Sequence, residues 1–248
     1  DGNGFSMFKG RLEEMNYTVS GSLDLTSNAI PEDAALLVVL APKEPFSAEE
    51  RGEVQRHLSS GNNALFLLDP GFRTGLERTF IHYQIQLGQN FVVDASGIGK
   101  LFGADVSSPV VVEYGNHPIT EEIPRGGMSF FPMARSVMKM PSLRPSAVAS
   151  ETQVVSLLTT HKSSWGESNI EPVFGREATV EFNRGEDTQG PLSLGVAVEA
   201  QPDSITDPDT KTRLVLFGDS DFVRNQFFGQ QVNGELIISS IKWLTESR

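Results

Sequence analysis

The sequence predicts a single α/β domain, with a mainly parallel sheet and a β-rich extension in the middle of the chain. In residues 1–104, short apolar runs typical of strands covered on both faces alternate with amphipathic, helix-like segments. The same alternation returns over residues 212–248, whereas strand-like segments follow one another without a convincing helix over residues 105–211. We therefore assign residues 1–104 and 212–248 to the core of one domain and residues 105–211 to the extension.

The chain opens with a predicted helix followed by two predicted strands. Apolar residues stand at helical spacing within residues 5–15, and they alternate with other residues over residues 17–25. Residues 34–40 form a continuous apolar run, which predicts a strand buried on both faces of a parallel sheet.

Ser47 marks the start of the next helix. Ser47 and Glu50 stand at the spacing of a capping box, in which the hydroxyl and the carboxylate bind backbone N–H groups that have no partner within the helix. Val54 and Leu58 are expected to face the core. Gly61 supplies the left-handed residue that commonly follows the end of a helix.

Two more predicted strands complete the first part of the chain. Residues 64–68 read as a buried strand that ends in the turn Asp69-Pro70-Gly71, and residues 91–94 read as a short strand. A second helix is expected between them, over residues 75–87. This β-α-β-α-β order predicts an open sheet with right-handed crossovers.

The middle of the chain contains β-branched and aromatic segments separated by clusters of Gly, Pro, Ser and Asn. The predicted strands are residues 109–114, 128–140, 154–161, 178–182 and 192–199. A polar loop follows over residues 201–212. Residues 213–217 then predict a strand, and residues 234–245 predict the last helix, with Leu236, Ile237, Ser240, Ile241 and Leu244 on its inner face.

Composition excludes several classes of function. The formal net charge of −12 argues against binding to nucleic acid or to an anionic membrane surface. No uncharged apolar run approaches the length of a membrane-spanning helix. The absence of cysteine excludes disulfides, thiolate zinc sites and cysteine nucleophiles, but it does not decide the compartment. Because the chain begins with Asp1-Gly2 and has no signal peptide, we expect it to be an excised piece of a longer protein.

Acidic residues follow several of the predicted strands. Asp69, Asp94, Asp219 and Asp221 each stand at the carboxyl end of a strand, where ligands bind in open α/β sheets. Carboxylates gathered at one sheet edge could hold Mg²⁺ or Ca²⁺. The alternative, which we favour, is that these side chains cap the turns that follow the strands.

Signals for covalent catalysis are weak. Ser220 lies in a strand-to-helix turn, but it is flanked by two aspartates and no Gly-x-Ser-x-Gly motif follows any predicted strand. The negative field of those aspartates would oppose formation of an alkoxide. No phosphate-binding loop of the Gly-x-x-x-x-Gly-Lys type is present. Trp165 stands in a polar stretch and is the best candidate for an exposed ring that binds a partner.

Motifs along nearly the whole chain together resemble one family. They include Ile30-Pro31-Glu32-Asp33-Ala34, Asn116-His117-Pro118-Ile119-Thr120, Phe131-Pro132-Met133-Ala134-Arg135, Ser164-Trp165-Gly166-Glu167, Leu216-Phe217-Gly218-Asp219-Ser220-Asp221-Phe222 and Lys242-Trp243-Leu244. In this order and spacing they resemble the soluble domain of the auxiliary component of gliding-motility-type ABC transport systems.

This resemblance implies a flavodoxin-like, class I glutamine amidotransferase-like three-layer sandwich, related to a domain of some intraflagellar transport proteins. It also implies a place on the extracytoplasmic (periplasmic) face of the bacterial inner membrane, tethered by segments absent from this chain. The amidotransferase cysteine is missing, so that chemistry is excluded. In the family a first strand precedes the Gly2-Asn3-Gly4 turn; if it is missing here, we expect a weakened sheet or an edge covered by another segment.

We therefore expect a non-enzymatic binding or scaffold domain without a cofactor, whose partners are ABC transporter membrane subunits. A ligand, either carbohydrate or peptide, is expected in a groove at the carboxyl edge of the sheet. The residues expected to bind it are Asp69, Asp94, Trp165, Asp219, Ser220, Asp221 and Asn225. The alternatives are a metal-dependent hydrolase that uses the same aspartates, and a purely structural interaction domain.

Overall fold

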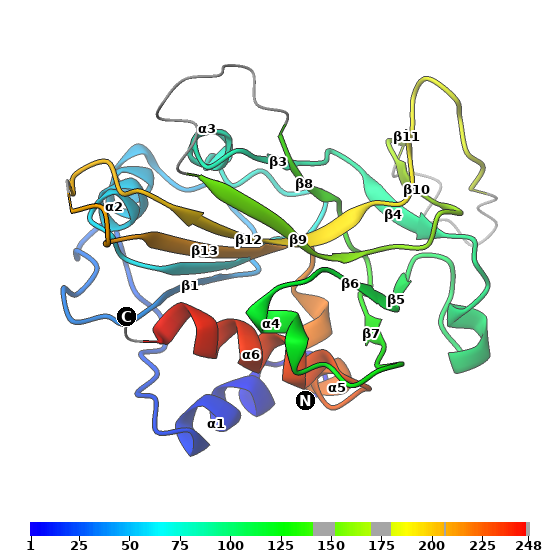
Figure 1. Cartoon of the computed structure of the whole chain (residues 1–248), viewed down its shortest axis with the longest axis horizontal. Coiled ribbons are helices and arrows are strands. Elements are labelled where there is room, and N and C mark those ends of the chain that lie inside the picture. The colour runs from blue at the N-terminus through cyan, green and yellow to red at the C-terminus, as the bar shows by residue number, and fades with distance from the viewer. Residues whose placement is uncertain (141–151, 170–179, 206, 247–248) are drawn as a thin grey trace.

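The computed structural model describes residues 1–140, 152–169, 180–205 and 207–246 (Figure 1). Its centre is a six-stranded sheet in the order β1-β2-β13-β12-β9-β6. The strands are β1 (Leu37–Leu40), β2 (Ala64–Leu67), β13 (Thr212–Phe217), β12 (Ser193–Ala200), β9 (Gln153–Thr159) and β6 (Glu113–Tyr114). None of the helices in these described ranges is long and apolar enough to cross a membrane.

The central sheet is mixed, and the prediction of a mainly parallel sheet is wrong in this respect. β2 pairs in parallel with β1 and with β13, but β12 runs antiparallel to both β13 and β9, and β6 runs antiparallel to β9. The antiparallel strands come from the part of the sequence without a convincing helix. Antiparallel neighbours do not need a helical crossover, so these strands join the sheet through loops.

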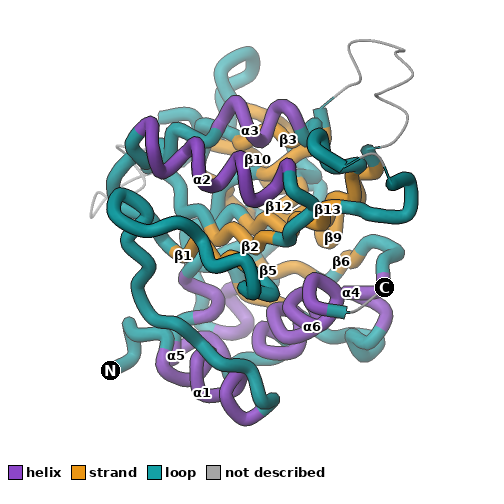
Figure 2. The backbone as a smooth tube through the Cα atoms, turned by 90° about the vertical axis from the view of Figure 1, so that its left-hand side faces the viewer, coloured by secondary structure: helices purple, strands orange, loops and turns teal. Residues whose placement is uncertain are grey.

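Helices cover both faces of the central sheet (Figure 2). α2 (Ala48–Ser59) and α3 (Glu77–His82) lie on one side, and α1 (Ser6–Glu14), α4 (Pro118–Glu121), α5 (Asn225–Phe228) and α6 (Asn233–Thr245) lie on the other. Alternate side chains of β2 enter the two cores, since Phe66 packs with α2 whereas Leu67 packs with α6. The result is a three-layer arrangement.

Within the described residues, three short sheets extend the fold beyond the central one. β4 (Phe91–Asp94) pairs antiparallel with β10 (Ser164–Glu167), which also pairs with β11 (Thr188–Gln189). β3 (Ile85–Leu87) pairs with β8 (Val137–Lys139), and β5 (Val110–Val111) pairs with β7 (Ser129–Phe130).

Local sequence signals give the helix boundaries. The Ser47 hydroxyl accepts the N–H of Glu50 at 3.2 Å, and the Glu50 carboxylate accepts the N–H of Ser47 at 2.7 Å, which confirms the capping box. Val54 and Leu58 are fully buried, and Gly61 has φ +84°. The five residues predicted on the inner face of α6 are all buried.

Several predicted elements differ in the structure. The predicted strand at residues 109–114 is divided into β5 and β6, and the one at residues 128–140 is divided into β7 and β8. Residues 17–25 form no strand; instead Tyr17 and Thr245 share a hydrogen bond of 2.7 Å between their side chains. The predicted helix over residues 75–87 is limited to α3, because Gln84 takes the left-handed conformation at φ +58° and the chain then enters β3. β4 has the predicted bounds, but it pairs with β10 outside the central sheet.

Two further predictions are a strand at residues 178–182 and a β1 strand that is buried on both faces. The predicted strand at residues 178–182 begins outside the described residues, and Val180, Glu181 and Phe182 form no strand. β1 lies at one edge of the central sheet and has no strand partner on its outer side among the residues that the structure describes. Val38 on this strand is 37% exposed, so β1 is not covered on both faces as its apolar run predicted.

His117 lies at the N-terminus of α4, where its Nδ1 accepts the backbone N–H of Ile119 at 3.2 Å. Its ring packs edge-on against Trp243, with centroids 4.8 Å apart. Burial, with a smaller effect from the charge of Arg213, lowers the pKa of His117 from 6.5 to about 4. The folded chain therefore keeps this imidazole neutral at pH values where the unfolded chain protonates it.

We expect the free energy of unfolding to fall as the pH is lowered from 6.5 to about 4, because only the unfolded chain takes up a proton on His117 over this range. His117→Asn should remove about 1–2 kcal/mol of that fall, a figure reduced for the partial exposure of the ring. Urea unfolding near neutral pH and at about pH 4.5 measures the difference. A His117→Asn variant that keeps the wild-type pH dependence would contradict the prediction.

Candidate functional site

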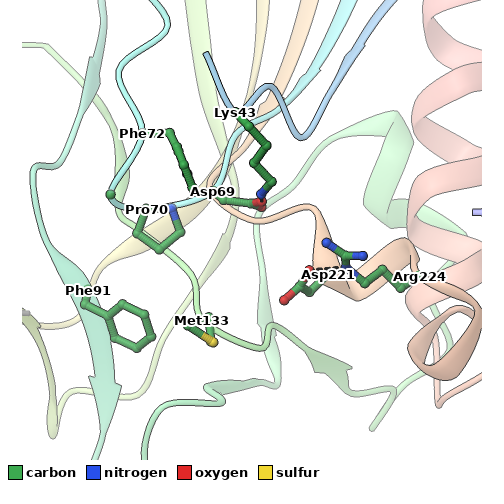
Figure 3. Close-up of a pocket in the computed structure, with 9 residues that line it drawn as sticks. Lys43, Asp69, Pro70, Phe72, Phe91, Met133, Asp221 and Arg224 are labelled. Carbon is green, nitrogen blue, oxygen red and sulfur yellow. Dashed lines mark hydrogen bonds and ion pairs between the residues drawn. The ribbon is translucent and has the colours of Figure 1, made fainter. Parts of the chain in front are cut away.

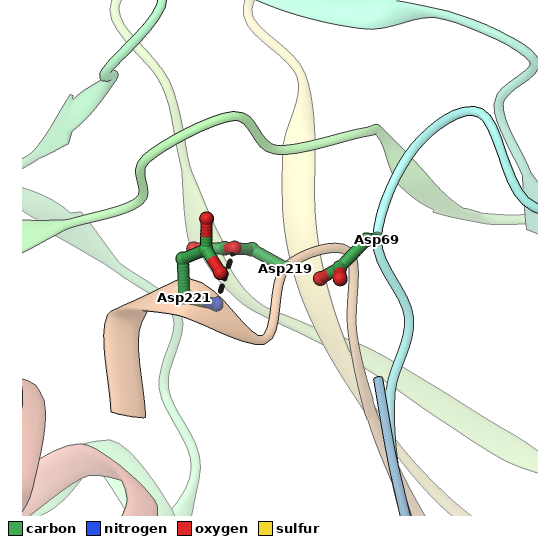
Figure 4. A group of neighbouring side chains, drawn as sticks. All are labelled: Asp69, Asp219 and Asp221. Carbon is green, nitrogen blue, oxygen red and sulfur yellow. Dashed lines mark hydrogen bonds between the residues drawn. The ribbon is translucent and has the colours of Figure 1, made fainter. Parts of the chain in front are cut away.

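Three of the predicted site residues meet at the carboxyl edge of the parallel half of the sheet. Asp69 follows β2, while Asp219 and Asp221 follow the neighbouring strand β13. One carboxylate oxygen from each lies within 4.8 Å of the other two (Figure 4). The parallel pairing of β2 and β13 brings these side chains together, as the sequence predicts.

Two of these carboxylates form ion pairs with side chains from other parts of the site. Asp69 Oδ2 accepts a hydrogen bond from Lys43 Nζ at 2.7 Å, and its Oδ1 accepts the backbone N–H of Ser220 at 2.8 Å. Asp221 accepts a hydrogen bond from Arg224 Nε. The two pairs place positive charge beside each of the outer carboxylates.

Asp219 is almost completely buried, whereas Asp69 and Asp221 are partly exposed. Its carboxylate accepts the backbone N–H groups of Asp221 at 2.7 Å and of Phe222 at 3.2 Å, so it caps the turn that follows β13. Burial raises the pKa of Asp219 well above 3.8, and the charges of Asp221 and Asp69 add to the effect. The environment therefore favours the protonated carboxyl more than that of an ordinary aspartate.

Ser220 does not have the exposure that a nucleophile requires. Its side chain is fully buried, and its Oγ has no hydrogen-bond partner among the described residues. The contribution of Ser220 to the cluster is its backbone N–H, which holds Asp69. The local structure thus fits a turn between two aspartates better than a reactive hydroxyl.

The other three predicted site residues lie elsewhere, each with its own protein partners. Asp94 accepts the N–H of Ser96 at 2.8 Å, which caps the turn after β4. Asn225 binds the N-terminal segment, since its Oδ1 accepts the N–H of Met7 at 2.8 Å. The sequence does not predict these positions, because they follow from the pairing of β4 with β10 and from the packing of α1 beside α5.

Trp165 is not the exposed ring that the sequence predicts. The side chain is 9% exposed, and its Nε1 donates a hydrogen bond to Glu167 at 3.2 Å. β10 lies between β4 and β11, so this residue packs within a three-stranded sheet rather than at an exposed turn.

A cavity of about 320 Å³ opens beside the aspartate cluster (Figure 3). One part of its wall is polar and carries the two ion pairs, while the other part is apolar. The lining residues are Lys43, Asp69, Pro70, Gly71, Phe72, Phe91, Met133, Asp221 and Arg224. We call this cavity the edge pocket.

The apolar part of the edge pocket comes from three separate segments. Phe72 belongs to the loop after β2, Phe91 begins β4, and Met133 lies between β7 and β8. Lys43 Nζ lies 4.5 Å from the centroid of the Phe72 ring, which itself is 39% exposed. Met133 has a left-handed backbone at φ +62°, a strained conformation for a residue other than glycine.

Arg135 fixes the loop that carries Asp69 and Phe72, although it does not line the edge pocket. The side chain is 2% exposed, and its Nε donates to the carbonyl of Gly88 at 2.8 Å. Its Nη1 donates to the carbonyls of Phe72 at 3.2 Å and Asp69 at 3.5 Å. Burial lowers the pKa of Arg135. A buried cation with carbonyl acceptors therefore joins this loop to residue 88.

Sequence reasoning missed most of the edge pocket. Lys43 follows the carboxyl end of β1. The rule that ligands bind at the carboxyl ends of the strands, which pointed to Asp69, could therefore have identified Lys43 as well. Arg224 stands three residues after Asp221, a spacing at which side chains of one helical turn meet. Met133 and Arg135 gave no such signal, because they come from a loop distant in sequence from both strands.

Comparison with known proteins identifies a family and a fold. The family model described as an ABC-type uncharacterized transport system matches residues 6–236. No curated protein matches the chain.

Two solved structures are similar over most of their length. The mmIFT52 N-terminal domain has a TM-score of 0.68 and 15% sequence identity, and the match covers 99% of this chain and 92% of that chain. A protein described as thua-like, from Bacteroides uniformis, has a TM-score of 0.52 and 13% identity, with coverage of 96% and 81%. At these identities the likeness concerns the fold alone.

Proposed function

The chain belongs to the family described as an ABC-type uncharacterized transport system, and from this premise we propose that it is a non-enzymatic binding or scaffold domain of such a system. It works on the extracytoplasmic face of the bacterial inner membrane, beside the membrane subunits of the transporter. The transport system is of the gliding-motility-related type that the sequence resembles. The edge pocket is the surface through which the domain recognises its ligand.

One observation carries the choice of recognition over catalysis. Each carboxylate of the aspartate cluster is already held by donors from the protein itself: Lys43 and Ser220 on Asp69, backbone N–H groups on Asp219, and Arg224 on Asp221. A metal-dependent hydrolase would need these oxygens for an ion and for the attacking water. The cluster is better suited to shaping a pocket than to activating water.

The proposal is tested in cells that make the full-length protein with its transporter. Protease added to intact spheroplasts should cleave the domain, because the proposal places it outside the cytoplasmic membrane. The tagged protein, solubilised in mild detergent, should purify together with the membrane subunits of its transporter. Cleavage only after the membrane is permeabilised would contradict the location, and purification without those subunits would contradict the partnership.

The metal-dependent hydrolase remains the second candidate, because the oxygens of Asp69, Asp219 and Asp221 lie within 4.8 Å of one another. We expect millimolar Mg²⁺, Ca²⁺ or Mn²⁺ to shift the midpoint of thermal unfolding by less than about 1 °C, since the carboxylates already have partners. An ion present at about 100 times its dissociation constant would add about 2.7 kcal/mol, which is a shift of several degrees. Such a shift in the wild type, lost in Asp219→Asn, would favour the hydrolase.

A further inference from the structure

We propose that the edge pocket binds a neutral carbohydrate. This inference rests on the proposed function, because it names the class of ligand that the same pocket recognises. Three properties of the pocket carry it: the balance of charge on its wall, the unused hydrogen-bonding groups, and the apolar surface that faces them.

The charges on the pocket wall balance. Lys43 and Arg224 each lie against one of the lining carboxylates, Asp69 at 2.7 Å from the ammonium and Asp221 in hydrogen-bond contact with the guanidinium. An anionic ligand would meet the two carboxylates, and a cationic ligand would meet the ammonium and the guanidinium. A neutral ligand can enter without separating either pair or leaving a charge unpaired.

Both pairs keep hydrogen-bonding capacity for a ligand. Lys43 Nζ carries three N–H groups and uses one of them on Asp69, and Arg224 Nη2 donates to none of the described residues. The second carboxylate oxygen of Asp221 likewise accepts no hydrogen bond from the described part of the chain. In Figure 3 one oxygen of Asp221 points away from Arg224, toward the side of the pocket where Met133 lies.

This set of groups matches hydroxyls. A sugar hydroxyl donates one hydrogen bond and accepts others, so neighbouring hydroxyls can donate to Asp221 and accept from Lys43 or Arg224. An aliphatic peptide side chain would fill the same space, but the unused N–H groups of Lys43 and Arg224 and the second carboxylate oxygen of Asp221 would lose their water without gaining a partner. The polar wall thus favours a polyhydroxylated ligand over an apolar one.

The opposite wall suits the other surface of a sugar ring. Phe72 and Met133 present an aromatic ring and a thioether beside the buried ring of Phe91, which is 1% exposed, and the C–H groups on one face of a pyranose can pack against such a surface. The volume of about 320 Å³ lies at the lower end of the range found for small-molecule sites. The pocket is therefore sized for a short saccharide rather than for a folded partner.

The test is binding of the purified chain to an array of neutral oligosaccharides printed beside carboxylated and sulfated counterparts, followed by titration calorimetry with the best neutral glycan. We expect binding to neutral glycans, with Phe72→Ala weakening it at least tenfold. Phe182→Ala is the matched control, because Phe182 is 40% exposed, close to the 39% of Phe72, and does not line the edge pocket. This control should bind within about twofold of the wild type.

Asp221→Asn supplies a second variant that keeps the size of the side chain but removes its charge. We expect it to weaken binding severalfold, with circular dichroism and thermal unfolding confirming that the chain is folded. Binding to charged glycans alone, or no binding to any neutral glycan, would overturn the proposal. An equal loss of affinity in Phe72→Ala and Phe182→Ala would overturn it as well. Purification with the transporter subunits would still stand in that case, so failure of the ligand class is distinguishable from failure of the proposed function.

Discussion

Replacement of Arg135 with leucine is expected to lower the free energy of unfolding by about 3 kcal/mol or more. Leucine removes the donors that hold the buried carbonyl of Gly88 and the partly buried carbonyls of Phe72 and Asp69, and a buried carbonyl left without a partner costs about 1–3 kcal/mol. Part of the loss is offset because a buried charge is also removed. Urea unfolding of the two proteins at neutral pH measures the difference.

Arg73→Leu is the matched control, because Arg73 lies in the same loop as Phe72 but is exposed. This variant should unfold within about 0.5 kcal/mol of the wild type. Arg135→Lys should give an intermediate loss, since lysine keeps the charge but cannot reproduce the planar fork of a guanidinium. A loss below about 1 kcal/mol in Arg135→Leu would mean that this side chain does not hold the loop after β2 in place.

Asn233→Ala is expected to cost about 3 kcal/mol as well. Asn233 is fully buried at the start of α6, where its Oδ1 accepts the backbone N–H of Phe130 at 2.9 Å. Its Nδ2 donates to the carbonyls of Phe130, Phe222 and Phe227, each at 3.2 Å. Alanine makes none of these bonds, and its better helix propensity recovers only a few tenths of a kcal/mol.

The control for this variant is Asn28→Ala, at an exposed asparagine with one hydrogen bond to the carbonyl of Asp24. It should change the free energy of unfolding by about 0.5 kcal/mol or less. Equal effects of Asn233→Ala and Asn28→Ala would show that burial of the Asn233 amide adds nothing, and would contradict its role in joining β7 to the turn after β13.

Helices and strands that depend on local sequence could be predicted, because the interactions that stabilise them are between residues close together in the chain. The capping box of Ser47 and Glu50 needs three residues of sequence, and α2 begins where that pattern places it. The continuous apolar run at β2 likewise predicts burial on both faces, and all four residues of the strand are buried.

Strand pairing depends on partners far along the chain, and here the prediction fails. The sequence predicts β4 in the same sheet as β2, but its partner is β10, more than sixty residues later. Residues 17–25 alternate as a strand would, yet no described strand pairs with them. Alternation reports which side chains face the core, and it does not report which backbone supplies the hydrogen bonds.

The candidate site follows the same division. The proximity of Asp69 and Asp219 could be predicted from the sequence, since each follows one strand of a parallel pair. The sequence groups Asp94 with them only if β4 belongs to that sheet, and β4 pairs with β10 instead. Phe72 and Met133 could not be foreseen as neighbours, because their approach depends on Arg135 and on a left-handed residue in a distant loop.

The position of β13 has a consequence for how the chain is made. This strand lies between β2 and β12 at the centre of the sheet, but it is the last strand to leave the ribosome. At a synthesis rate of about 5–20 residues per second, β13 is made on the order of ten seconds after β2. A chain that stops before residue 212 lacks the strand that joins β2 to β12. Each of these two strands is then left with an unpaired apolar edge, which exposes the chain to aggregation and proteolysis.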